Sequence, residues 1–140
     1  MGPLTRLSLA AATALLAACA TPYRPDSILN QGGYSEQRRA PNLYAVWFRG
    51  NVNTPTDRCE ELAVLRAAEL CLADSKPFMR TSDFQTTAPS VHWVPSGERE
   101  PPQTALKVEC LAEKSDDTQD AAAVAESTRK RYRITSKPRP

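Results

Sequence analysis

Four cysteines and one histidine are the side chains of this 140-residue chain best suited to covalent, metal or acid–base chemistry. Cys19 follows an apolar run near the start, Cys59, Cys71 and Cys110 are spread over the middle, and His92 is the only histidine. Structural zinc sites use closely spaced pairs of ligands, and the sequence has no C-x-x-C pair. It also lacks the G-x-G-x-x-G and P-loop patterns of nucleotide sites. We therefore expect no metal and no cofactor.

The first eighteen residues predict a secretory signal peptide, residues 1–18. Arg6 is the only charged side chain among them, and residues 7–18 are apolar or small. A short positive segment before an apolar core of about 7–15 residues is typical of such signals, whereas a membrane span needs roughly 20 apolar residues. Pro22 and Arg24 close the run, so we interpret it as a signal.

Residues 16–19, which read Leu-Ala-Ala-Cys, resemble the bacterial lipobox. The resemblance implies cleavage between Ala18 and Cys19, a diacylglyceryl group on the Cys19 thiol, and acylation of the new amino terminus, for example by palmitate. Ala20, where an Asp would favour retention in the inner membrane, implies transfer to the outer membrane of a Gram-negative cell. The triplet Ala18-Cys19-Ala20 also fits ordinary signal cleavage, which would release a soluble periplasmic protein.

Export implies an oxidising compartment, where cysteines pair if geometry allows. Cys59 and Cys71 lie on one predicted helix, twelve residues or about 18 Å apart, whereas a disulfide needs Cα atoms within about 7 Å. Cys110 is therefore the only partner for either. We favour Cys71–Cys110, because Cys71 ends the helix and Cys110 shares a strand face with Leu106 and Val108. A Cys59–Cys110 bond and three reduced, buried thiols remain the alternatives.

Three segments have clear secondary-structure patterns. Residues 43–49 and 104–112 alternate as β-strands, and residues 57–72 predict a helix with a broad apolar face. Arg66 and Glu69 lie on the polar stripe of that helix, and we interpret them as an ordinary surface pair. Weaker patterns predict strands near residues 78–80, 91–94 and 131–135 and a short helix near 117–127.

These patterns predict an α+β fold, with one main helix packed on a small antiparallel sheet. The order of the elements is compatible with a ferredoxin-like sandwich without requiring it. We expect a lipid anchor and flexible tether (19–42), because this range is rich in Pro and Gly and has no period. A single domain (43–135) and a basic tail (136–140) complete the predicted organisation.

Six basic and no acidic residues occupy the last twelve positions, so the chain has a basic end. We interpret this end as solvated, and anion binding by it is the alternative.

Three blocks of sequence, residues 33–38, 43–51 and 65–70, are similar to a known set of proteins. Together with the lipobox they resemble a family of small uncharacterised proteobacterial lipoproteins, which run GYS-x-Q, Y-x-V-x-F-x-GN and L-x-R-A-A-E-L in this order. The resemblance covers residues 16–72, roughly half of the chain. It implies an envelope location and brings no activity, cofactor or catalytic residue with it.

The sequence thus predicts a non-catalytic envelope lipoprotein that binds or scaffolds another component. Its expected partners are the membrane, through the lipid on Cys19, and an envelope protein or anionic lipid, whereas export argues against nucleic acid. The alternative is a periplasmic enzyme with a site near His92, which has no nucleophile motif beside it.

Overall fold

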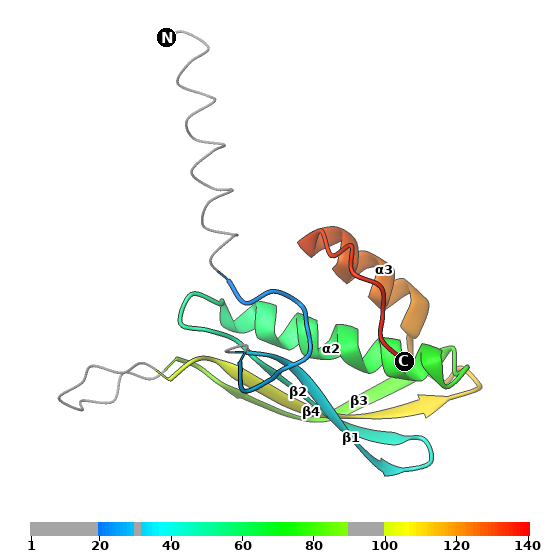
Figure 1. The fold of residues 1–140 in the computed structure, drawn as a ribbon. Coiled ribbons are helices and arrows are strands. Elements are labelled where there is room, and N and C mark those ends of the chain that lie inside the picture. Colours follow the sequence, from blue (N-terminus) through cyan, green and yellow to red (C-terminus); the bar gives the residue numbers. More distant parts are fainter. Residues whose placement is uncertain (1–19, 30–31, 90–99) are drawn as a thin grey trace, which may run out of the picture.

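The computed structural model describes residues 20–29, 32–89 and 100–140. Its elements in chain order are β1 (Gly33–Ala40), β2 (Leu43–Arg49), α2 (Thr56–Ala73), β3 (Phe78–Thr87), β4 (Gln103–Leu111), β5 (Gln119–Asp120) and α3 (Ala121–Tyr132). The predicted α+β class is confirmed. Figure 1 shows α2 lying along one face of the sheet, with α3 packed against α2.

The sheet has five strands in the order β1-β2-β4-β3-β5, and all neighbouring strands are antiparallel. After β2, the chain passes over one face of the sheet as α2 and then forms β3. The next strand, β4, lies between β2 and β3 in the sheet. This β-α-β-β unit matches the first half of a ferredoxin-like fold. The second half differs, because α3 packs mainly on α2 and the edge beside β2 is occupied by β1.

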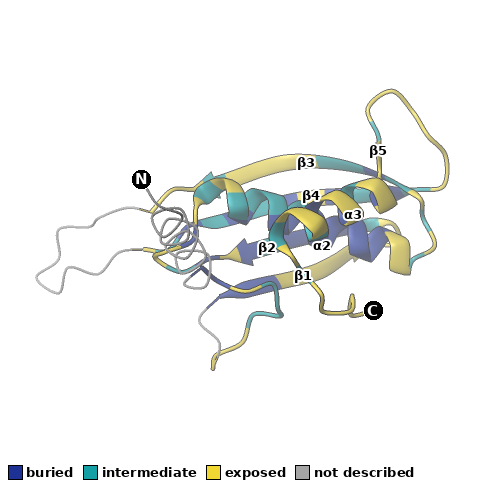
Figure 2. Cartoon of the chain, turned by 90° about the horizontal axis from the view of Figure 1, so that it is seen from above, coloured by how far each residue is buried: buried dark blue, intermediate teal, exposed yellow. Residues whose placement is uncertain are grey.

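The core lies between α2 and the sheet, where the burial in Figure 2 is concentrated. Alternate residues of β2 and β4 face the helix, as the sequence pattern predicts. Cys59, Leu62, Leu65 and Ala68 meet them from α2, and Met79 of β3 completes this apolar layer. The strand residues of the layer are Tyr44, Val46, Phe48, Leu106, Val108 and Cys110.

The range 19–42 is not all tether, which corrects the predicted organisation. Gly33–Ala40 forms the edge strand β1, paired with β2 from Gly33↔Arg49 onward. Upstream of it, Pro25 forms a parallel bridge with Tyr34. The strand lacks the usual alternation of apolar and polar residues, because Glu36 and Arg38 occupy positions that face the helix.

The prediction of a last strand at residues 131–135 is wrong. Tyr132 ends α3, and Arg133 follows it in the left-handed conformation, with φ 54°. The short helix predicted near residues 117–127 forms as α3 and begins four residues later, where the Asp120 carboxylate caps it by accepting a bond from the Ala123 amide at 2.9 Å. The weak strand predicted at residues 91–94 lies outside the described residues.

Candidate functional site

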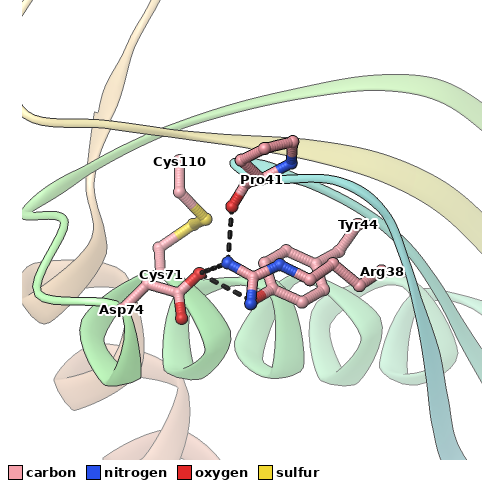
Figure 3. Close-up of a disulfide and its surroundings, with 6 residues drawn as sticks. All are labelled: Arg38, Pro41, Tyr44, Cys71, Asp74 and Cys110. Carbon is pink, nitrogen blue, oxygen red and sulfur yellow. Dashed lines mark hydrogen bonds and ion pairs between the residues drawn. A yellow bond between two sulfur atoms is a disulfide. The ribbon is translucent and has the colours of Figure 1, made fainter.

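The sequence-derived site residues are only partly within the described chain. Ala18, Cys19 and His92 lie outside it. Cys71 and Cys110 form the disulfide that we favoured, with Cα atoms 5.1 Å apart and a sequence separation of 39. This bond joins the last turns of α2 to the end of β4 (Figure 3).

Beside the disulfide, a small polar network attaches the β1–β2 turn to the end of α2 (Figure 3). The Asp74 carboxylate accepts bonds from the Tyr44 hydroxyl at 2.6 Å and from Arg38 at 3.3 Å. Arg38 also donates to the Pro41 carbonyl at 2.6 Å. Burial and the Asp74 hydrogen bond both raise the pKa of Tyr44, so its hydroxyl remains a donor at neutral pH.

Cys59 is the free cysteine of the described chain, and it is buried in the first turns of α2. Its sulfur lies 3.6 Å from the Pro102 carbonyl oxygen. Burial raises the pKa of the thiol to about 11. The reactive thiolate is therefore scarce at neutral pH, which makes Cys59 a poor nucleophile.

The most unusual site is a group of charges centred on the buried side chains of Arg66 and Glu69 of α2. We call it the Glu69 cluster, and it consists of Tyr23, Glu36, Arg66, Glu69 and Arg129. The prediction that Arg66 and Glu69 form a surface pair is wrong, because their side chains are only 2% and 1% exposed. Three elements remote in sequence cover them: the segment before β1, β1 itself and α3.

Glu69 is the centre of the cluster. Its Oε2 accepts bonds from the Tyr23 hydroxyl at 2.6 Å and from Arg66 Nη1 at 3.4 Å. Its Oε1 accepts from Arg129 through Nε, at 3.0 Å, and through a second, shorter bond from Nη2. Both carboxylate oxygens are thus engaged, as a buried carboxylate requires.

Arg66 holds β1 to the helix through a two-point ion pair. Its Nε and Nη2 donate to the two Glu36 oxygens at 3.1 and 2.7 Å. Burial lowers the pKa of Arg66, but the hydrogen bond and charge of Glu36 outweigh this and the net shift is upward. Two carboxylates and two guanidiniums therefore balance one another, a condition for keeping ions in a low-dielectric interior.

Aromatic rings line the same cluster. The Arg66 guanidinium lies 4.5 Å from the centre of the Tyr34 ring, and the Tyr23 and Tyr34 rings are 4.8 Å apart. Burial, followed by the Glu69 charge, raises the pKa of Tyr23. Tyr23 therefore keeps its proton and acts as a hydrogen-bond donor.

The last residues of the chain pass over the cluster as well. Arg66 Nη1 donates to the Arg139 carbonyl at 2.9 Å, and Arg129 Nη1 donates to the Ser136 carbonyl at 2.5 Å. A groove of about 360 Å³ lies beside them. The tail thus uses main-chain oxygens to pack on the helices.

The geometry makes the Glu69 cluster a structural clamp. Each of its carboxylates already accepts from a guanidinium, so neither is poised as a free base. The sequence contained a partial signal, since Arg66 and Glu69 lie one turn apart at the border of the apolar face. The sequence could not show that Tyr23 and Arg129, which are 46 and 60 residues from Glu69, bind its carboxylate and cover this side of the helix.

The opposite face of the sheet carries a second surface of interest, a shallow groove of about 630 Å³. Trp47 and Ala45 from β2 and Ala105 from β4 form its floor, and Arg39 and Lys107 are at its sides. Neither α2 nor α3 covers this face in Figure 1. It offers an aromatic and apolar surface with charges of both signs at its sides, because Asp83 also lines the groove and pairs with Lys107 at 2.7 Å.

Fold and clamp together define a helix-on-sheet domain whose first and last described segments are both fixed to the main helix. Within the described ranges, neither helix is long and apolar enough to cross a bilayer. Comparison of the chain with protein families, curated proteins and solved structures finds no match.

Proposed function

We propose that this chain is an envelope lipoprotein, anchored through Cys19 at the periplasmic face of the outer membrane, with a non-catalytic binding or scaffolding role. The observation that carries the proposal is the sequence Leu-Ala-Ala-Cys directly after an apolar signal core. The resemblance of residues 16–72 to proteobacterial lipoproteins supports the same conclusion. Several acyl chains on one residue give firm anchoring, whereas a single chain is marginal.

The domain offers a surface suited to a binding role. The uncovered sheet face combines Trp47 with apolar and charged neighbours, and aromatic residues are enriched in protein interfaces. The clamp holds the segments at both ends of the described chain, near Tyr23 and Arg139, on the helical side of the sheet.

The anchor is tested by the intact mass of the mature protein isolated from membranes, with Cys19→Ala as control. The expected mass corresponds to a chain that starts at Cys19 and carries diacylglyceryl and an N-acyl group. The control should lose the lipid and leave the membrane fraction. An unmodified chain that starts at Ala20 or Thr21 would contradict the proposal.

The binding role is tested by a photo-crosslinking residue at Trp47, with the same residue at Gln119 as a control on the exposed strand β5. A specific adduct with an envelope component is expected from position 47 only. If repeated crosslinking in intact cells returns no adduct from position 47, the sheet face is not the binding surface.

A further inference from the structure

The end of the domain nearest Cys19 is packed tightly from the first described residue. Ala20 and Thr21 are buried. The Thr21 amide donates to Thr54 Oγ1 at 3.0 Å, and the Thr54 hydroxyl donates to Thr21 Oγ1 at 3.1 Å. Cys19 directly precedes Ala20 in the sequence, and consecutive Cα atoms are about 3.8 Å apart. A lipid on Cys19 would therefore bring this end of the domain to the bilayer surface.

Exposed apolar side chains gather at the same end. Ile28 and Leu29 are 102% and 93% exposed, and Val52 is 51% exposed. They are three of the five large hydrophobic side chains that are exposed in the described ranges. The other two, Leu72 and Phe84, lie late in α2 and within β3.

These three residues lie within a few positions of Gly32 or Thr54, the two residues that contact Thr21. Gly32 lies against it, since a Cβ built on Gly32 would be 3.0 Å from the Thr21 methyl group. Leu29 precedes Gly32 by three residues, so it is within about 11 Å along the chain. Val52 is two residues from Thr54, which binds Thr21 directly.

The charges at this end do not form a basic patch. Asp26 pairs with Arg49 at 3.0 Å, and the described segments that adjoin this end also carry Arg24, Asp57, Arg58 and Glu100. Near-balanced charge gives little attraction to anionic lipid. Burial of exposed apolar side chains is then the main favourable term available for contact with a membrane.

We propose that Ile28, Leu29 and Val52 form a membrane-contact patch that inserts into the interfacial layer of the bilayer carrying the Cys19 lipid. The patch rests on the proposed function, because the lipid brings it to the surface. It adds an orientation to the anchor: residues 28, 29 and 52 face the lipid, and the disulfide end of α2 points away.

The test uses mature, lipidated protein in vesicles of zwitterionic phospholipid. A polarity-sensitive fluorophore is placed at Leu29→Cys, or at Leu72→Cys as the matched control, in a Cys59→Ala background. Leu72 lies sixteen residues beyond Thr56 on α2, about 24 Å along the helix axis. We expect a blue shift and strong quenching by nitroxide-labelled lipid at position 29, and neither at position 72. Adding Ile28→Ser and Val52→Ser should reduce the quenching at position 29, whereas Leu72→Ser should not.

The outcomes separate the patch from the anchor. A lipidated protein that floats with the vesicles but shows equal quenching at positions 29 and 72 overturns the patch and leaves the anchor intact. Quenching at position 29 that requires anionic lipid also overturns it, because charge would then drive the contact. If the unmutated mature protein isolated from membranes carries no lipid on Cys19 and does not float with the vesicles, the anchor is overturned and, with it, the patch.

Discussion

The hydroxyl of Tyr23 donates a 2.6 Å hydrogen bond to the buried carboxylate of Glu69, across 46 residues of sequence. This bond fixes the segment that follows Cys19 to the middle of the main helix. Arg129 binds the other oxygen of the same carboxylate, so one side chain of α2 holds segments from both ends of the described chain. Three predictions concern the forces that hold the domain together, and one concerns a surface loop.

Tyr23→Phe should lower the free energy of unfolding by about 1.5–3 kcal/mol, because it removes a hydrogen bond to a buried charge while keeping the ring. Urea unfolding followed by circular dichroism measures the effect. Tyr34→Phe is the matched control, since the Tyr34 ring keeps its contacts with Tyr23 and Arg66. Equal midpoints for the two variants would contradict the role of the Tyr23 hydroxyl.

Glu69→Gln should lower the free energy of unfolding further, by about 3–5 kcal/mol, because it leaves buried guanidinium charge without its partner. Protease cleavage between residues 20 and 33 should accelerate, since Tyr23 is released with it. Glu61→Gln on the same helix is the control. Glu61 pairs with exposed Arg131 at 2.6 Å, and such surface pairs contribute about 0–1 kcal/mol. Similar losses in both variants would refute the central place of Glu69.

The elements that could be predicted from sequence are those whose burial follows a simple period. Residues 43–49 and the strand that contains Val108 alternate because one face meets α2, and both were predicted within a residue or two. The Cys71–Cys110 pairing was favoured over its alternatives because Cys71 ends the helix and Cys110 shares a strand face with Leu106 and Val108, and the structure confirms it. These features depend on local geometry, which sequence spacing encodes.

The features that were missed depend on contacts between distant polar residues. β1 faces the helix with Glu36, whose partner is Arg66 rather than the apolar core. Unless the Glu36–Arg66 pair is known, the alternation of helix-facing and solvent-facing residues in β1 cannot be recognised from the sequence. The helical pattern predicted that Arg66 and Glu69 face solvent, because nothing in the sequence of α2 shows that Tyr23 and Arg129 cover them.

Opening the Cys71–Cys110 disulfide should cost about 3–4 kcal/mol, as expected for cross-linking a loop of 39 residues. Reductant should therefore lower the melting temperature of the unmodified domain. It should have no such effect on the Cys71→Ser/Cys110→Ser variant, which starts from the lower value. Cys59→Ala is the control, because its response to reductant should match that of the unmodified domain. An unchanged melting temperature on reduction would mean that the disulfide contributes little to the stability of the domain.

Asp117 should titrate far below an ordinary aspartate. Hydrogen bonds from Arg80, the nearer of which is 2.6 Å long, lower its pKa from 3.8 to about 2. Because the folded pKa is the lower one, the ionised carboxylate favours the folded loop above about pH 4, and this preference is lost as the pH falls toward 2. Carboxyl carbon chemical shifts measure the midpoint. In Arg80→Gln the midpoint of Asp117 should return toward 3.8. The control Lys107→Gln removes an ion pair with Asp83 instead, and it should leave the Asp117 midpoint near 2. A midpoint near 3.8 in the unmodified chain would show that the Arg80–Asp117 pair does not form in solution.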